Sequence, residues 1–310
     1  MPASIFRLVA GVLLFFAGIS LLRKGLKRKT RIMAERALRD LTSKPGIAVI
    51  IGVLVTCAMQ SSSAVTVIIV GLVDSGVLDI YQAFFIIIGA NLGTCMTAYI
   101  VAFRTKALGF LAFTVSIFLF VFARRKFSRD LAVIFLGLGC IFQGVEVTGS
   151  ALTWLAEIPD MLYALIVFGQ IPLFGILAGA VFTGIIQSSS VVMAILVGLV
   201  REGLVDLKSA VSLALGSNIG TCITTLIAGL GASSAGRFTA LLHLAFNLIG
   251  VIVILPVFNG FMMLVEAISS SDPGYVLANA NTIFNFMSIL VVFPWGRQFV
   301  DLMKGRRRWI

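Results

Sequence analysis

The sequence predicts an all-α integral membrane protein with inverted-topology repeats, two re-entrant hairpins and two broken transmembrane helices. Hydrophobic residues make up 59% of the 310 positions and charged residues only 12%, and the mean hydropathy is +1.09. Such a chain cannot bury its apolar surface in its own core, so a bilayer must solvate it. In addition, a Gln-Ser-Ser-Ser run begins at Gln60 and again at Gln187, 127 positions later. Two copies of a polar run inside an apolar chain indicate a paired binding site.

The first region, residues 1–45, is predicted to hold a transmembrane helix followed by a basic interfacial helix. The apolar stretch 3–22 precedes a dense basic run and shows no cleavage site, which favours a retained helix over a signal peptide. Residues up to 42 mix apolar and basic side chains, as expected for a helix on the cytoplasmic surface. The N terminus is therefore expected outside the cell.

The next apolar segments are too short to cross a bilayer. Residues 46–59 make 14 residues before Gln60, or about 21 Å of helix against a hydrocarbon core of about 30 Å. We expect this segment to turn at Gln60 and to return as residues 65–73, forming a re-entrant hairpin. Residues 172–186 and 191–200 repeat the pattern around Gln187. Non-helical backbone at membrane depth is tolerated only where protein or water covers it, so each Gln-Ser-Ser-Ser tip is expected to line a cavity.

After each hairpin comes a longer apolar segment with a polar, glycine-containing centre. Residues 83–103 and 210–230 both contain Gly-x-Asn-x-Gly-Thr, centred on Asn91 and Asn218. Two glycines weaken a helix by about 1 kcal/mol each relative to alanine, so a break is expected in both segments. Asp79 and Asp206 are expected to be the N-caps of these helices. Further spans are predicted at residues 107–123, 131–147, 238–258 and 276–293, with another apolar piece at 151–167.

The distribution of basic residues predicts the topology. Lys and Arg gather in residues 23–44, 124–129 and 297–308, which the positive-inside rule places in the cytoplasm. With this orientation the two hairpins enter from opposite sides, an arrangement typical of secondary transporters. The predicted divisions are the first transmembrane helix and basic interfacial helix (1–45), repeat 1 (46–123), a linker with transmembrane segments (124–171), repeat 2 (172–258), and the last transmembrane helix with a basic cytoplasmic tail (259–310). A multi-pass protein of the plasma membrane is expected, with basic loops and the C-terminal tail cytoplasmic.

Several function classes are disfavoured by the composition. The net charge of +11 lies in clusters that flank apolar segments, so it indicates contact with anionic lipid of the bilayer, and no nucleic-acid partner is expected. The cysteines show no CxxC spacing, which argues against disulfides and a metal cluster. The chain has one histidine, His243, and neither HExxH nor GxSxG, so an enzyme is not expected. For His243 we favour an interhelical hydrogen bond over a pH-sensing role.

The doubled Gln-Ser-Ser-Ser run, each followed by Gly-x-Asn-x-Gly-Thr, resembles the sodium-dependent phosphate cotransporter family, which includes the type II sodium/phosphate symporters. The resemblance covers approximately residues 11–294. It implies sodium-coupled symport of inorganic phosphate into the cell, with sodium as the coupling ion and no organic cofactor. Members often carry a C-terminal domain resembling a phosphate regulator, which is not seen before the chain ends, so regulation through it is not expected.

The residue chemistry of the repeats fits this implication. Serine hydroxyls and the N–H groups at helix N-termini suit an oxyanion, whereas amide and threonine oxygens suit sodium. No Arg or Lys lies in either repeat core, so a cation must arrive with the anion. The phosphate candidates are Ser61, Ser62, Ser63, Ser188, Ser189, Ser190, Asn91 and Asn218. The sodium candidates are Gln60, Gln187, Thr94, Thr221, Asn91 and Asn218, and the additional candidates are Thr97, Thr224, Asn247 and Asn285.

Other interpretations of these motifs stay open. A single polar triplet in a membrane helix usually serves helix packing, and the matched second copy is what favours a binding site. Asn247 and Asn285 can equally bridge helices. Hydroxyl and N–H donors bind any oxyanion, so sulfate or a carboxylate is an alternative substrate, and an ion channel is a further alternative. The sequence does not decide whether the protein is a homodimer.

Overall fold

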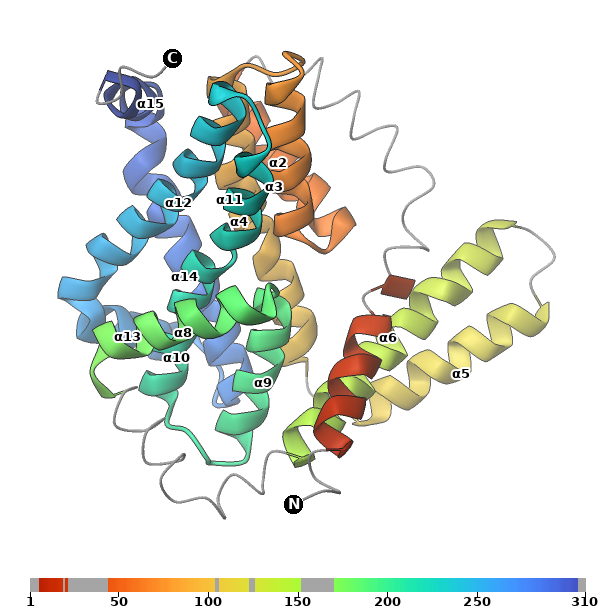
Figure 1. The fold of residues 1–310 in the computed structure, drawn as a ribbon. Coiled ribbons are helices and arrows are strands. Elements are labelled where there is room, and N and C mark those ends of the chain that lie inside the picture. The colour runs from red at the N-terminus through yellow and green to blue at the C-terminus, as the bar shows by residue number, and fades with distance from the viewer. Residues whose placement is uncertain are drawn as a thin grey trace.

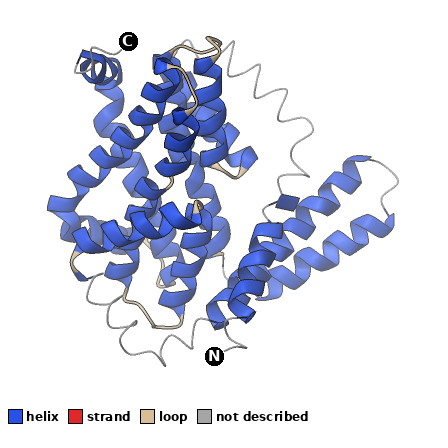
Figure 2. Cartoon of the chain, in the orientation of Figure 1, coloured by secondary structure: helices blue, strands red, loops and turns tan. Residues whose placement is uncertain are grey.

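The computed structural model describes residues 6–18, 20–21, 44–103, 106–122, 126–151 and 170–305, and helices are the only regular secondary structure among them (Figure 2). Four helical stretches in this part are long and apolar enough to cross a membrane: Ile80–Ala102, Leu207–Leu230, Ser234–Ile268 and Pro273–Gly305. The chain is thus an all-α membrane protein. The expected basic interfacial helix lies outside the described residues, and so does almost all of the apolar piece at 151–167.

The helices are described in two series, one on either side of residues 152–169 in the chain (Figure 1). The first series consists of an N-terminal helix (Phe6–Gly18), α2 (Pro45–Met59), α3 (Ser62–Asp74), α4 (Ile80–Ala102), α5 (Lys106–Phe122) and α6 (Lys126–Ala151). The second consists of α8 (Pro172–Ile186), α9 (Ser189–Arg201), α10 (Leu207–Gly220), α11 (Cys222–Leu230) and α12 (Ser234–Ile254). It continues with η2 (Leu255–Val257), α13 (Phe258–Ile268), α14 (Pro273–Val292), η3 (Phe293–Trp295) and α15 (Gly296–Gly305). The short pairs α2/α3 and α8/α9 lie where the hairpin arms were predicted.

The helix α4 is continuous, so the break expected around Asn91 is wrong. The glycines of this segment serve close packing instead. A Cβ atom added to Gly89 would lie 2.1 Å from the carbonyl oxygen of Val49, and one added to Gly52 would lie 2.1 Å from that of Ile86. The backbones of α2 and α4 therefore touch, and the burial of this contact offsets the weak helix propensity of glycine.

The corresponding segment of the second series is interrupted at one residue. Thr221 separates α10 from α11, although its backbone angles (φ −65°, ψ −20°) stay close to helical values. The helical path continues through this residue, and Leu207–Leu230 forms one apolar stretch long enough to cross a membrane, so the predicted break is reduced here to a one-residue irregularity. Gly216 repeats the close contact, since an added Cβ atom would lie 2.0 Å from the carbonyl oxygen of Ile176.

Both predicted N-caps are confirmed. The Asp79 carboxylate accepts hydrogen bonds from the backbone N–H groups of Tyr81 and Gln82 and forms a capping box. The Asp206 carboxylate accepts one from the N–H of Ser209 at 2.9 Å. These bonds satisfy first-turn donors that the helix itself cannot pair, which explains why α4 and α10 begin where they do.

The core is built around α4 and α10. The helix α2 packs along α4, α8 packs along α10, and both α12 and α14 contact α4 and α10. The N-terminal helix, α5 and α6 stand to one side (Figure 1). Small residues bring the N-terminal helix onto α6, because a Cβ atom at Gly18 would lie 2.7 Å from the carbonyl oxygen of Gly137. This contact positions the end of the N-terminal helix beside the tips.

Candidate functional site

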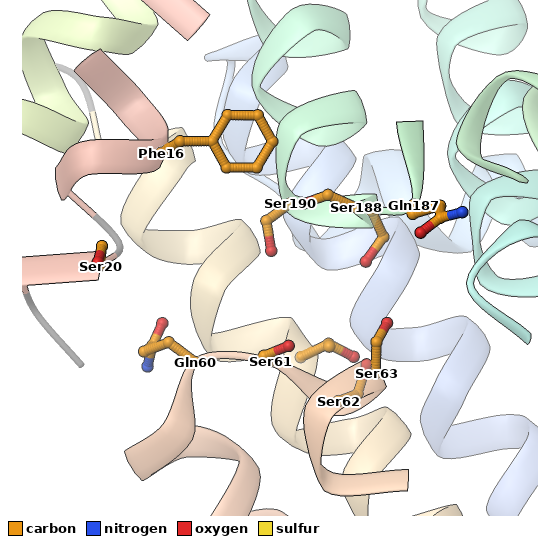
Figure 3. Close-up of a pocket in the computed structure, with 11 residues that line it drawn as sticks. Phe16, Ser20, Gln60, Ser61, Ser62, Ser63, Gln187, Ser188 and Ser190 are labelled. Atoms are coloured by element: carbon orange, nitrogen blue, oxygen red, sulfur yellow. The ribbon is translucent and has the colours of Figure 1, made fainter. Parts of the chain in front are cut away.

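Both Gln-Ser-Ser-Ser tips line one cavity of about 320 Å³. Figure 3 shows the two runs facing each other across it, with Ser188 and Ser190 on one side and Ser61 to Ser63 on the other. The cavity is lined by Phe16, Ser20, Gln60, Ser61, Ser62, Ser63, Thr94, Gln187, Ser188, Ser189 and Ser190. Two motifs 127 positions apart in the chain therefore meet in space.

Each tip is formed by one glutamine in a left-handed backbone conformation. Gln60 (φ 51°) and Gln187 (φ 58°) are the two non-glycine residues with positive φ in the described part of the chain. Their N–H groups donate to the carbonyl oxygens of Thr56 and Thr183 and close the first arm. A left-handed residue costs about 1–3 kcal/mol outside glycine and persists where the surrounding structure determines it. Each glutamine, together with the extended serine that follows it, forms the two-residue link between consecutive helices.

The helix that follows each of these glutamines, α3 or α9, begins with a serine N-cap. Ser61 Oγ accepts a hydrogen bond from the N–H of Ala64 at 3.2 Å, and Ser188 Oγ accepts one from that of Val191 at 3.4 Å. The first turns of α3 and α9, which carry the remaining serines, thus point their N-termini into one cavity. A helix N-terminus carries unpaired N–H groups and about half a positive charge, so this pair of termini favours an anion.

A second, very small cavity of about 10 Å³ lies next to α9. Its lining joins both series of helices: Thr94, Ala98, Ser189, Ser190, Met193, Ser217, Asn218 and Asn281. Asn218 Nδ2 donates to Asn281 Oδ1 at 3.1 Å. The sequence analysis did not propose Asn281 or Ser217, and the structure brings both to the serines of the second tip.

Asn91 belongs to a buried hydrogen-bond network between α4 and α12. Its Nδ2 donates to Asn247 Oδ1 at 3.0 Å, and its Oδ1 lies 3.2 Å from His243 Nε2. The other ring nitrogen of His243 lies 3.1 Å from Thr225 Oγ1. The predicted interhelical role of His243 is therefore confirmed. Asn247 bridges helices, as one of its two sequence interpretations proposed.

Asn218 has a matching network between α10 and α14. Besides Asn281, it contacts Asn285, whose Nδ2 lies 3.4 Å from Asn218 Oδ1. The partners on the two helices correspond at a constant separation of 38 positions: His243 to Asn281, Asn247 to Asn285 and Pro256 to Pro294. This second repeat was the signal from which Asn281 could have been found. The helix α12 thus bonds to Asn91 of α4 as α14 bonds to Asn218 of α10. The equivalent residue is His243 in α12 and Asn281 in α14.

Comparison with known proteins places the chain in a family. The model of the family described as Na+/Pi-cotransporter matches residues 14–150 and 157–291. The chain belongs to the Na+/Pi-cotransporter family. This confirms the resemblance that the doubled motif indicated, and it assigns the protein to a family of phosphate transporters.

Relatives of this Na+/Pi-cotransporter family member differ in length and description. It is 35% identical over 271 residues to the uncharacterized protein YqeW of Bacillus subtilis (strain 168), covering 86% of this chain and 87% of that protein. It is 26% identical over 269 residues to the putative inorganic phosphate export protein YjbB of Salmonella typhimurium, covering 86% and 49%. It is 37% identical over 91 residues to the sodium-dependent phosphate transport protein 2A of Oryctolagus cuniculus, covering 27% and 14%. No solved structure gave a significant match.

In this cotransporter-family chain, the predicted site residues divide by location. The six tip serines, Gln60, Gln187 and Thr94 line the larger cavity, and Asn218 lines the smaller one with Thr94. Thr97 is not among the residues that line either cavity, but its hydroxyl donates a hydrogen bond to Gln60 Oε1 of the first tip at 3.0 Å. The hydroxyls of three threonines donate to carbonyl oxygens of their own helical segments, namely Thr94 to Asn91, Thr221 to Asn218 and Thr224 to Thr221.

Two residues that line the larger cavity, Phe16 and Ser20, were not predicted from the sequence because they lie outside both repeats. Phe16 lies near the end of the N-terminal helix, and Ser20 follows that helix in the chain (Figure 3). No motif marks them, since their place in the cavity depends on how the N-terminal helix packs on α6. The cavity therefore lies between the repeats and a separate group of helices.

Proposed function

We propose that the protein is a secondary active transporter that couples sodium to the movement of inorganic phosphate into the cell. The observation that carries this proposal is the shared cavity, where the N-termini of α3 and α9 face one space lined by the six tip serines and Ser20. Helix N-termini and hydroxyl donors form a site for a tetrahedral oxyanion. The family match makes phosphate the oxyanion that we favour.

The neutral lining of the cavity supports a coupled cation. All eleven lining residues are uncharged, so no side chain offsets the charge of a bound phosphate. Two helix dipoles offset about one charge, and sodium is proposed to supply the remainder. The amide and hydroxyl oxygens of Gln60, Gln187, Thr94 and Thr221 are the ligands we propose for it, with Asn91 and Asn218 contributing to either ion. Phosphate and sodium would then each bind poorly without the other.

The proposed mechanism uses the predicted inverted repeats, residues 46–123 and 172–258. The first arms α2 and α8 have 15 residues each, about 22 Å of helix, which supports two re-entrant hairpins whose tips meet near the middle of the membrane. Phe16 belongs to the helix that packs on α6, and Ser20 follows that helix in the chain. Movement of the two-hairpin unit against that helix would open the cavity first to one side and then to the other.

A second candidate function concerns direction. The YjbB relatives are described as putative phosphate export proteins, so export is the alternative to uptake. The cavity geometry serves either direction, because the ion gradients and not the binding groups decide it. Right-side-out membrane vesicles loaded with or surrounded by radiolabelled phosphate separate the two: our proposal predicts accumulation inside with an inward sodium gradient.

The central experiment is phosphate uptake by purified protein in proteoliposomes, with sodium or choline outside. We expect accumulation above the external phosphate concentration only with a sodium gradient. Phosphate uptake that is the same with sodium and with choline would contradict sodium coupling. Accumulation of sulfate but not of phosphate would contradict the proposal that phosphate is the substrate. Flux that equilibrates without accumulation would favour a channel.

A further inference from the structure

Thr56 and Thr183 carry buried hydroxyl groups that have no hydrogen-bond partner. Both side-chain oxygens are inaccessible to solvent, and the residues are 1% and 0% exposed. They are separated by 127 positions, the spacing of the two tips. The same unsatisfied group therefore occurs in the same place in both repeats.

Buried hydroxyls elsewhere in the described helices are satisfied. Thr239 Oγ1 donates to the carbonyl oxygen of Ala235 at 2.9 Å, one turn back along the helix, and Thr66 Oγ1 pairs with Thr225 Oγ1 at 2.7 Å. A buried hydroxyl without a partner is costly, and valine has nearly the same shape without that cost. The recurrence of threonine at both positions indicates that the hydroxyl has a partner that is not part of the chain.

The surroundings of the two hydroxyls favour a cation as that partner. Each threonine lies one turn before a tip glutamine, in the last turn of α2 or α8, where carbonyl groups and the helix dipole carry partial negative charge. Across the helix interface, Cβ atoms added to Gly93 and Gly220 would lie 2.7 and 2.6 Å from the Cβ atoms of Thr56 and Thr183. Thr56 thus packs against Gly93 of α4, and Thr183 packs against Gly220 at the end of α10.

The first site has a further oxygen in a defined position. Gln60 is 6% exposed, and its Oε1 accepts the hydrogen bond from Thr97 while its Nε2 donates to the carbonyl oxygen of Cys57 at 2.5 Å. The amide is therefore held against the end of α2. The described residues contain no cluster of three His, Cys, Asp or Glu side chains. Neutral oxygens without carboxylates suit a monovalent hard cation better than a divalent one.

We propose that Thr56 Oγ1 and Thr183 Oγ1 are ligands of two equivalent sodium sites, at the C-terminal ends of α2 and α8. This inference rests on the sodium coupling proposed above and adds two ligands to it. Each tip then holds opposite charges on its two sides: the anion at the N-terminus of the second arm and the cation at the C-terminus of the first. Only the left-handed glutamine and the N-cap serine separate the two helix ends, which couples the two ions over a short stretch of chain.

The test replaces each hydroxyl by a methyl group with Thr56→Val and Thr183→Val, singly and together. Phosphate uptake is measured against sodium concentration in proteoliposomes, and the melting temperature of purified protein is measured in sodium and in choline. We expect the half-saturating sodium concentration to rise about tenfold for each variant, the loss of one oxygen that contacts a charge. The double variant should lose the stabilisation that sodium confers on the wild type.

Melting in choline separates a ligand from a structural hydroxyl. A group that has no partner in the chain costs nothing to remove, so both variants should melt in choline at or above the wild-type temperature. Thr56→Ser and Thr183→Ser keep the hydroxyl and should keep the sodium dependence. Thr239→Val, which removes a hydroxyl bonded within its own helix, is the matched control and should leave the sodium dependence unchanged.

The experiments distinguish a failure of the proposed threonine ligands from a failure of the proposed sodium coupling. Unchanged sodium dependence in Thr56→Val and Thr183→Val, with sodium-driven uptake by the wild type, would overturn only this inference. Lower melting temperatures of the valine variants in choline would also overturn it, because the hydroxyls would then have partners within the protein. Phosphate uptake by the wild type that is indifferent to sodium would overturn the proposed coupling itself.

Discussion

Thr97 Oγ1 donates a hydrogen bond to Gln60 Oε1 at 3.0 Å, and this contact ties the middle of α4 to the first tip. Both residues are buried, with exposed fractions of 4% and 6%. The bond orients the amide oxygen that we propose as a sodium ligand. The geometry of the tip therefore depends on a residue 37 positions away.

Removal of this bond is expected to weaken sodium binding. Thr97→Val removes the hydroxyl that donates to the Gln60 amide, and a loss of about 1 kcal/mol corresponds to an approximately fivefold rise in the half-saturating sodium concentration. Thr97→Ser should restore the wild-type value. Sodium-dependent phosphate uptake measures the effect, and Thr114→Val on the exposed face of α5, where the hydroxyl bonds to Phe110, serves as the control. Equal sodium dependence in Thr97→Val and wild type would exclude this role.

The cap serines and the first-turn serines are expected to differ in their effects. Ser61 and Ser188 hold the N-termini of α3 and α9, so replacement by alanine should lower the free energy of unfolding by about 1 kcal/mol. Ser63→Ala and Ser190→Ala remove donors proposed for phosphate. They should raise the KM for phosphate by about tenfold or more, with little change in stability, because a donor to a charged group is lost. Thermal unfolding and uptake kinetics are measured for all four alanine variants. If all four changed stability and the KM for phosphate to the same extent, the cap serines and the first-turn serines would not have different roles.

His243 is expected to act through its hydrogen bonds. His243→Leu leaves Asn91 Oδ1 and Thr225 Oγ1 without this partner in the core. The expected cost is about 1–3 kcal/mol in the free energy of unfolding. His243→Asn copies the residue found at the equivalent position, Asn281, and should cost less. Chemical unfolding of the two variants tests the order, and a more stable leucine variant would refute the interpretation.

Asp74 is expected to make stability depend on pH. The N–H of Ser233, at the N-terminus of α12, donates to the Asp74 carboxylate at 2.6 Å, and this bond lowers the pKa of the carboxyl group. Because the folded pKa lies below the unfolded value of about 3.9, the stabilising contribution is complete above that value and is lost as the pH falls through the folded pKa. The melting temperature of Asp74→Asn should fall below that of the wild type at pH 7, and the difference should shrink below about pH 4. A difference that is constant with pH would contradict the role of the charge.

Several features of this protein followed from local sequence alone. The composition required a bilayer, and the helix caps at Asp79 and Asp206 followed from short-range hydrogen bonding. The arm lengths and the doubled run predicted the helix pairs α2/α3 and α8/α9, because a turn at Gln60 or Gln187 needs only the residues next to it. The family was also recognisable, since two matched motifs at one spacing are a specific signal.

Contacts between distant segments were decided only in the tertiary structure. The continuity of α4 depends on how closely α2 approaches it, and that packing outweighs the glycines that locally predicted a break. Asn281, Phe16 and Ser20 reach the cavities through helices that carry no copy of the motif. The sequence by itself thus determined that the protein lies in a bilayer, where its turns occur and that two polar runs are paired. These features depend on composition and on neighbouring residues. The partners of those runs depend on which helix faces meet between segments far apart in the chain, and only the packed structure specifies that.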